Sequence, residues 1–209
     1  MTVTSADVVA AAAWARDTLG PAHASDWEAR AGEPEWTCRR TLDHMANTSI
    51  FYATALANRS TGQMPKVRNG DPGAPVRILL EIVPAAAGIL AEVARAAPVD
   101  ARGWHPAGIA DAEGFCAMGA DEILVHTADI AAGLGVDCDP PADLCARVGA
   151  RLFPWAPAGV DPWASLWWAN GRAPLDDRAR LDPDWFWHCA PLSEWDGTVK
   201  RRSTPPGWR

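Results

Sequence analysis

The segment Met118–Gly135 most constrains the fold, because it reads as one long helix that carries ionisable side chains on one side. Glu122 and His126 are four residues apart, so they lie one above the other on a helix surface. A carboxylate and an imidazole on adjacent turns can bind the same metal ion. Asp129 follows one turn later on nearly the same side. Two ligands do not complete a metal site, so the segment predicts that another part of the chain supplies the rest.

Apolar residues recur at helical spacing in five segments. The segments cover residues 5–19, 38–58, 74–97, 118–135 and 141–153, and the fourth is expected to begin between residues 112 and 119. Pro84 must kink the third helix or divide it in two. No strand pattern of period two occurs before residue 154. The four longer segments therefore predict a mainly all-α fold built on a four-helix bundle.

The composition changes at residue 154. Eight of the 12 Trp lie in residues 155–209, where Pro and Gly are also frequent. We expect residues 1–153 to form the helical bundle and 154–209 to be an irregular extension packed on it, with a few short strands such as 184–189. Most of the Trp rings would fix this extension to the bundle. Others, Trp168 among them, would line a pocket and stack on an unsaturated substrate.

Charge and cysteine content exclude several classes of protein. The net charge of −7 and the absence of basic clusters argue against nucleic acid or an anionic membrane as the main partner. The first residues have no basic region before an apolar run, and no apolar stretch is long enough to span a bilayer. The five Cys are scattered without a CxxC pair, which predicts reduced thiols and a cytoplasmic location.

His44 lies in the middle of the second predicted helix and is the candidate that completes the pair Glu122 and His126. Facing helices of a bundle project such side chains into one interior site. A bound divalent ion would compensate the cost of burying them, and a buried hydrogen-bond network is the alternative. Composition does not decide between the two. His188, beside Trp187, is a candidate for an extra ligand, whereas His105 is expected to be a loop residue.

Two motifs resemble those of a known family. Trp36-Thr37…Leu42-Asp43-His44-Met-Ala-Asn47 and Glu122-Ile-Leu-Val-His126-Thr-Ala-Asp129-Ile-Ala…Leu-Gly135 resemble two helices of the DinB-like superfamily, in particular its mycothiol-dependent maleylpyruvate isomerase branch. The resemblance covers residues 5–153. It implies a DinB-like bundle in which His44, Glu122 and His126 hold zinc or another divalent metal. Many DinB relatives use three His, so Glu122 suggests the isomerase-like branch.

The resemblance also implies a chemistry. Two His and one Glu leave zinc an open position, where water or a thiol is activated by a lowered pKa. Thiol-dependent members of the branch use mycothiol, and metal-bound thiolate attacks an electrophilic small molecule, giving a transferase or an isomerase. We expect Asp129, rather than Asp43, to orient a His ligand. Asn47 is expected to contact substrate, and its alternative is a buried amide bonded to the backbone.

The C-terminal part departs from the family pattern. The isomerase has a larger second domain that supplies a basic substrate residue, whereas about 55 residues follow the bundle here. Arg172 is the candidate substitute that would bind a substrate carboxylate, and its alternative is a surface Arg stacked on Trp. The rival functions are a metal-water hydrolase or hydratase, Fe(II) oxygen chemistry, and a non-catalytic metal or small-molecule binding protein. Such bundles often form homodimers, which an exposed Trp would favour.

Overall fold

The computed structural model describes residues 2–33, 35–71 and 73–203, and its chain is mainly helical, as the sequence predicts. The α-helices are α1 (Ser5–Leu19), α2 (Cys38–Asn58), α3 (Val76–Ala96), α4 (Ala112–Leu134), α5 (Ala142–Leu152) and α6 (Pro162–Ala169). Two short 3-10 helices, η1 (Gly20–Ala22) and η2 (Leu192–Glu194), and two strands, β1 (Arg102–His105) and β2 (Gly108–Asp111), complete the named elements.

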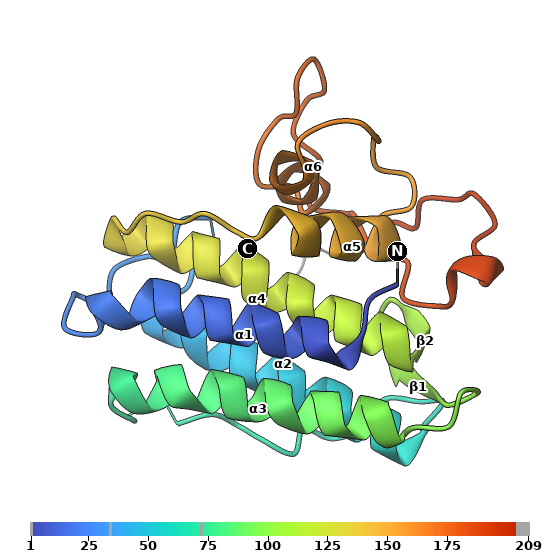
Figure 1. The fold of residues 1–209 in the computed structure, drawn as a ribbon, viewed down its shortest axis with the longest axis horizontal. Coiled ribbons are helices and arrows are strands. Elements are labelled where there is room, and N and C mark those ends of the chain that lie inside the picture. The colour runs from blue at the N-terminus through green and yellow to red at the C-terminus, as the bar shows by residue number, and fades with distance from the viewer. Residues whose placement is uncertain (1, 34, 72, 204–209) are drawn as a thin grey trace.

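The four longest helices lie side by side (Figure 1). α1 and α2 each contact both α3 and α4, so α4 packs between them. Their facing sides bury apolar residues such as Leu42, Leu90 and Ile123. Gly119 allows a close approach, because a Cβ there would lie 2.8 Å from a methyl group of Leu90. This packing brings the middle of α2 against the middle of α4.

The ends of α2 and α4 follow from local side-chain chemistry. Thr37 caps α2 by accepting a hydrogen bond from the backbone N–H of Arg40 at 3.2 Å. Asp111 caps α4 by accepting one from Gly114 at 2.8 Å. Gly135 ends α4 with a φ of +66°, the left-handed conformation that glycine adopts most readily. These caps fix where the ionisable residues of each helix lie along its axis.

α3 continues through Pro84 as one element. Of the two predicted alternatives, a kink or a division, the division into two helices is therefore excluded. Proline removes one backbone hydrogen bond. The buried apolar residues Leu79, Leu80, Val83 and Ala87 lie on both sides of this position and keep α3 packed against its neighbours.

β1 and β2 form an antiparallel hairpin between α3 and α4, in a part of the sequence that shows no strand pattern. Trp104 pairs with Ile109, and His105 pairs with Gly108, whose φ is +140°. Strands of four residues are too short to establish an alternating pattern in the sequence. Conversely, residues 184–189 form no strand; Trp185 makes only an isolated bridge with Arg201.

α5 and α6 lie on the opposite side of α4 from α3 (Figure 1). The following segment returns to α4 and is held there by Arg151, which is 1% exposed. Its guanidinium donates to the carbonyl of His188 at 3.1 Å and to Asp111 at 2.6 Å. Gly114 lies so close to this segment that a Cβ would be 2.1 Å from the carbonyl oxygen of Cys189. The proposed boundary at residue 154 stays a prediction.

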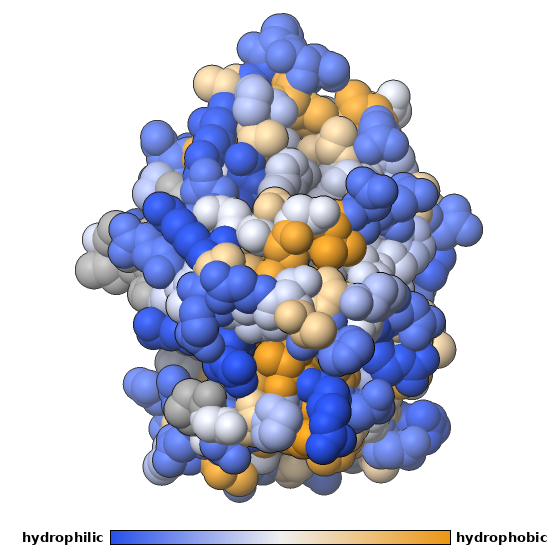
Figure 2. Space-filling view, turned by 90° about the vertical axis from the view of Figure 1, so that its left-hand side faces the viewer, coloured by the Kyte–Doolittle hydropathy of each residue, from blue (hydrophilic) through white to orange (hydrophobic). Residues whose placement is uncertain are grey.

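The surface is mixed in polarity on the face that Figure 2 presents. Apolar side chains lie there in small separate patches among hydrophilic ones. Among the described residues, no helix has the length and apolarity that a membrane crossing requires.

Candidate metal centre

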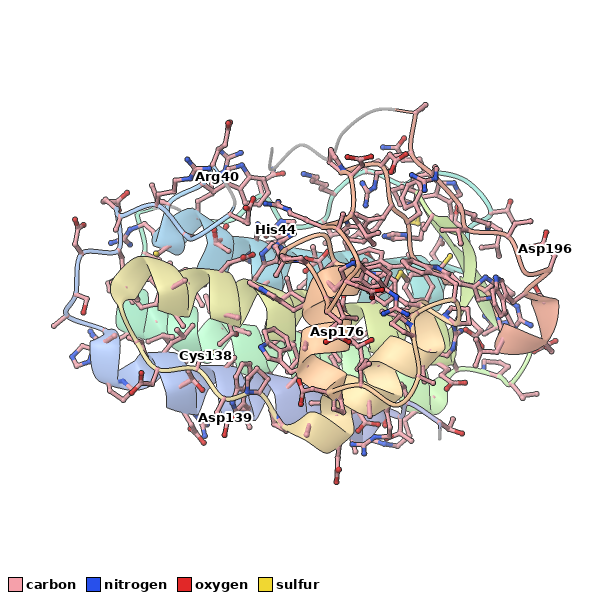
Figure 3. The ribbon with its side chains drawn as sticks, turned by 90° about the horizontal axis from the view of Figure 1, so that it is seen from above. Arg40, His44, Cys138, Asp139, Asp176 and Asp196 are labelled. Atoms are coloured by element: carbon pink, nitrogen blue, oxygen red, sulfur yellow. The ribbon has the colours of Figure 1, made fainter. Side chains whose placement is uncertain are left out.

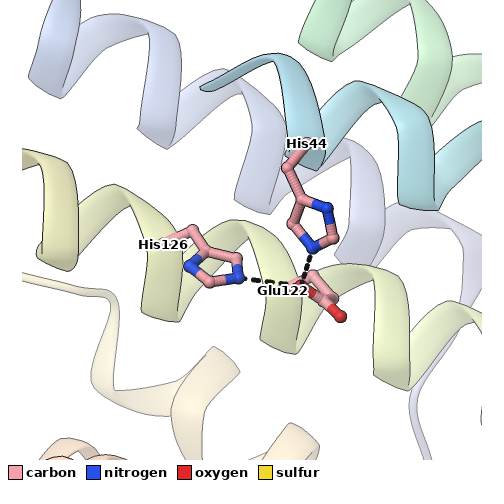
Figure 4. Close-up of side chains that lie close together, drawn as sticks. All are labelled: His44, Glu122 and His126. Carbon is pink, nitrogen blue, oxygen red and sulfur yellow. Dashed lines mark ion pairs between the residues drawn. The ribbon is translucent and has the colours of Figure 1, made fainter. Parts of the chain in front are cut away.

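His44 of α2 meets Glu122 and His126 of α4 at the predicted place (Figure 4). Nε2 of His44 lies 3.3 Å from Oε2 of Glu122, and Nε2 of His126 lies 3.1 Å from the same oxygen. One ligand atom from each of the three side chains lies within 4.8 Å of the other two. The imidazole rings are nearly perpendicular, at 82°, with centroids 5.2 Å apart. Both rings thus turn a nitrogen towards one carboxylate.

This donor set fits a divalent ion. Ligand atoms about 2.0–2.2 Å from a tetrahedral zinc lie roughly 3.4 Å from one another. The observed N···O distances of 3.1 and 3.3 Å are close to that separation. Two imidazole nitrogens and one carboxylate oxygen also leave at least one coordination position for an exogenous ligand. The same distances suit a hydrogen-bonded network, so geometry alone supports both interpretations.

Charges in the centre stabilise one another without an ion. Burial opposes ionisation of Glu122, but hydrogen bonds with His126 and His44 outweigh it and hold the Glu122 pKa well below its usual value. Burial likewise opposes protonation of His126, yet its bonds to Asp129 and Glu122 raise its pKa to about 9. A cation therefore suits this pocket, whether it is a metal ion or a shared proton.

Asp129 orients His126, as the sequence predicts. Its Oδ2 lies 3.0 Å from Nδ1 of His126. Burial raises the Asp129 pKa, but bonds with His126 and Arg172 lower it below the usual value, so the carboxylate is an acceptor. His126 consequently donates from Nδ1, and its Nε2 lone pair can bind an ion that displaces the Nε2 proton.

Arg172 completes this chain of contacts from the C-terminal segment. Its Nε donates to Oδ1 of Asp129 at 3.1 Å, and its Nη2 donates to Oδ2 at 2.8 Å. Its Nη1 donates to the carbonyl of Asn170. Arg172 borders the cavity described below but is 6% exposed, so this guanidinium mainly holds Asp129.

Tyr52 is a contact that the sequence interpretation missed. Its hydroxyl donates to Oε1 of Glu122 at 3.2 Å, which leaves Oε2 for the two His nitrogens. Burial, followed by the charge of Glu122, holds the Tyr52 pKa well above its usual value, so the hydroxyl keeps its proton. The signal was present: Tyr52 lies eight residues after His44, two turns along one helix face.

A cavity of about 820 Å³ opens beside the centre. Aromatic rings form much of its wall, and basic side chains lie around it. The rings are Trp36, Phe51, Tyr52, His105, Trp185, Phe186 and Trp187, and the basic residues include Arg39, Arg40, Lys66 and Arg202. Figure 3 shows Arg40 towards the outer edge and His44 farther in. The guanidinium of Arg40 lies 4.4 Å from the Trp36 ring, which in turn contacts His44 at 4.9 Å between centroids.

Asn47 also lines the cavity, but its amide is engaged within the protein. It donates to Asp43 at 3.0 Å and accepts from Arg68, which also pairs with Asp43. Asp43 thus binds Arg68, in agreement with the choice of Asp129 as the carboxylate that orients a ligand. The predicted contact between Asn47 and substrate stays a prediction.

Two predicted residues lie away from the centre. Trp168 is 7% exposed, donates to the carbonyl of Ala179 at 2.9 Å and is not among the residues that border the cavity. Its assignment to substrate binding has no support in this geometry. His188 contacts the carbonyl of Pro191 at 3.1 Å and does not join the three-residue cluster.

Asp121 and Arg202 were not recognised in the sequence. Asp121 is 1% exposed and accepts hydrogen bonds from Asn170 at 2.9 Å and Trp187 at 2.8 Å, while burial raises its pKa to about 7. Arg202 borders the cavity with its guanidinium 4.1 Å from the Phe186 ring. Its Nε donates to the carbonyl of Trp185, and its two Nη atoms have no hydrogen-bond partner within the described part of the chain.

Comparison with family models, curated proteins and solved structures gives no match. Any family assignment therefore depends on the two motifs and on the site geometry.

Proposed function

We propose that this protein is a metal-dependent thiol transferase or isomerase with a DinB-like four-helix bundle formed by α1 to α4. The supporting observation is the convergence of His44, Glu122 and His126 beside an aromatic-lined cavity. His44, Glu122 and His126 would hold zinc or another divalent ion. When bound, the ion supplies Lewis acidity that makes a low-molecular-weight thiol such as mycothiol nucleophilic near neutral pH.

The remaining residues of the site have distinct tasks in this proposal. Asp129, clamped by Arg172, keeps His126 in the tautomer that presents Nε2. Tyr52 holds one oxygen of Glu122 and so directs the other towards the ion. Stable orientation of this kind keeps the ligands in place while an exogenous ligand exchanges.

The cavity wall suggests which electrophile would bind. The two Nη groups of Arg202 have no hydrogen-bond partner among the described residues, so Arg202 takes the anion-binding role that was expected of Arg172. The rings of Phe51 and Trp187 suit a flat, unsaturated small molecule. All five Cys are free thiols, in keeping with a proposed cytoplasmic location.

A metal measurement tests the proposal. The protein is purified without a His tag, its metal content is measured, and the measurement is repeated with His126→Ala. We expect close to one equivalent in the first sample and none in the second. Absence of metal from both samples, including after incubation with zinc, would falsify the proposal.

A second measurement tests the thiol. Mycothiol added to cobalt-substituted protein is expected to produce a sulfur-to-metal charge-transfer band. Bound cobalt without such a band would favour the metal-water hydrolase or hydratase, or a non-catalytic binding protein. Size-exclusion chromatography of the same sample tests the expected homodimer.

A further inference from the structure

The connection from α2 to α3 has to run back along the bundle. Both helices end beside β1 (Figure 1): the N–H of Trp104 in β1 donates to the carbonyl of Ser60, just after α2, at 2.7 Å, and β1 follows α3 after a short loop. The chain must therefore return the length of α2, about 30 Å, before α3 can begin. We call residues 60–71 of this return the crossover segment.

Arg68 holds the middle of the crossover segment against α2. Its Nη2 lies 2.5 Å from Oδ1 of Asp43, and its Nη1 donates to the Asp43 carbonyl at 3.3 Å and to Oδ1 of Asn47. Asn47 in turn donates to Asp43 at 3.0 Å, so two side chains one turn apart bind one guanidinium. The backbone at Gly70 lies so close that a Cβ would be 2.0 Å from Oδ2 of Asp43.

The rest of the crossover segment is held more loosely. Residues 61–67 are exposed apart from Met64, and Val67 is 69% exposed. Met64 accepts a hydrogen bond from Asn58 at 3.0 Å through its sulfur, which is a weak acceptor. A segment with few buried apolar contacts opens at a low cost in free energy. The guanidinium of Arg68 is therefore the main restraint on its position over α2.

The crossover segment forms part of the rim of the cavity. Lys66 and Asn69, on either side of Arg68 in the sequence, both border the cavity. Thr48 of α2, which follows Asn47, borders it as well. The contact of Arg68 with α2 thus decides where Lys66 and Asn69 stand relative to the opposite side of the mouth.

We propose that Arg68 is a positioning residue that latches the crossover segment to α2, and that release of this latch moves Lys66 and Asn69 outwards and widens the mouth for bulky ligands. The latch gives a task to Asp43 and Asn47, which border the cavity but are engaged by Arg68. This inference goes beyond the proposed function and needs neither metal nor thiol, so each can fail without the other.

Proteolysis with endoproteinase Lys-C tests the latch in the metal-free protein. The chain has two Lys, Lys66 in the crossover segment and Lys200 near the C-terminal end, so the second cut is an internal control. A native segment is cut through its open state, so the rate follows the population of that state. We expect Arg68→Met to be cut after Lys66 about tenfold faster, the factor of one charge-assisted hydrogen bond. Cleavage after Lys200 should not change.

Three further variants show whether the contact itself is responsible. Asp43→Asn removes the charge on the other side of the latch and should also speed the cut after Lys66. Arg68→Lys keeps a point charge without the planar fork and should give an intermediate rate. Arg59→Met, at an exposed arginine of the same connection, should match the wild type. Equal cleavage after Lys66 in wild type and Arg68→Met would overturn the latch.

Thiol labelling tests whether the latch controls the mouth. Thr48→Cys places a thiol on the cavity wall, and its reaction with Ellman's reagent, a bulky aromatic disulfide, is compared with and without Arg68→Met. Protein with Thr48 intact gives the background from the native Cys. We expect labelling to be about tenfold faster without the latch, in proportion to the open population.

The native thiols separate opening of the mouth from general unfolding. Four of the five Cys are buried, namely Cys38, Cys116, Cys145 and Cys189, and their slow reaction should be the same in both backgrounds. Equal labelling of Thr48→Cys with and without the latch would contradict the proposal. Faster reaction of the buried native thiols in Arg68→Met would assign the effect to unfolding and would refute it as well.

Discussion

The two walls of the cavity are built in different ways. On one wall, His44, Glu122 and His126 come from α2 and α4, whose packing depends on buried apolar faces. On the other, the irregular segment after α5 is held by hydrogen bonds to buried charges, chiefly from Arg172 to Asp129 and from Trp187 to Asp121. Helix geometry positions the first wall locally, whereas the second depends on single long-range polar contacts. The second wall should therefore be more sensitive to single substitutions.

Loss of the contact between Arg172 and Asp129 should destabilise the second wall more than any other single change described below. Arg172→Met leaves the Asp129 carboxylate, 1% exposed, without its bidentate partner. Removing one member of a buried ion pair costs about 3–5 kcal/mol, so we expect the free energy of unfolding to fall by that amount. Chemical denaturation of the metal-free protein measures it.

Two further variants show whether the unpaired charge is responsible. Arg172→Met combined with Asp129→Asn should recover part of the lost stability, because no charge is then left unpaired. Arg178→Met changes an exposed arginine of the same segment and should alter stability by less than about 0.5 kcal/mol. An Arg172→Met variant as stable as Arg178→Met would mean that this contact does not hold the second wall.

Glu122→Gln tests the first wall. Four-ligand zinc sites gain about 10–16 kcal/mol on binding, so one ligand accounts for roughly 3 kcal/mol, or about a 100-fold change in zinc affinity. We expect that loss with the helices intact, measured by competition with a chelating dye and by circular dichroism. Glu81→Gln, the same change at an exposed position of α3, is the control. Unchanged zinc affinity in Glu122→Gln would refute the ligand assignment.

The pH dependence of stability tests the buried, neutral state of His105. Its pKa is about 3 in the folded protein, whereas the ordinary value is 6.5. Below pH 6.5 the unfolded chain binds a proton that the folded chain does not, so this histidine should reduce stability by about 1.4 kcal/mol for each pH unit down to its folded pKa.

His105→Phe should remove this contribution, so the difference in unfolding free energy between wild type and variant should change between pH 6.5 and 4. Denaturation midpoints at several pH values measure that difference. His23→Phe, at an exposed histidine, serves as the control. Parallel stability profiles for wild type and His105→Phe would show that folding does not lower the His105 pKa.

Tyr52→Phe should have the smallest effect. It removes one hydrogen bond to Glu122 Oε1 and keeps the ring, so zinc affinity should fall by about 1 kcal/mol, or roughly fivefold. The absorption spectrum of the cobalt-substituted variant should also change, because both oxygens of Glu122 can then reach the ion. An identical spectrum would mean that Tyr52 does not control how the carboxylate binds.

The sequence predicted the helical part of the fold well. Periodic apolar residues located α1 to α5 to within a few residues, because the residues that each helix buries recur at the helical period along the sequence. The hairpin of β1 and β2 was missed, since four residues per strand establish no period. α6 was missed within a segment interpreted as irregular. The choice of Arg172 as an anion binder could not be checked without knowing that Asp129 lies opposite it.

The residues of the sequence by themselves determined the pair Glu122 and His126, because helical spacing places them on one face, and they pointed to His44 on a second helix. Only the tertiary structure decided that Tyr52 contacts Glu122, that Arg172 contacts Asp129, and that His105 faces the cavity. The first two contacts join residues 70 and 43 positions apart, and no local periodicity encodes such pairs. The pair of ligands on α4 is a local property of the sequence, whereas the contacts that orient these ligands arise from packing.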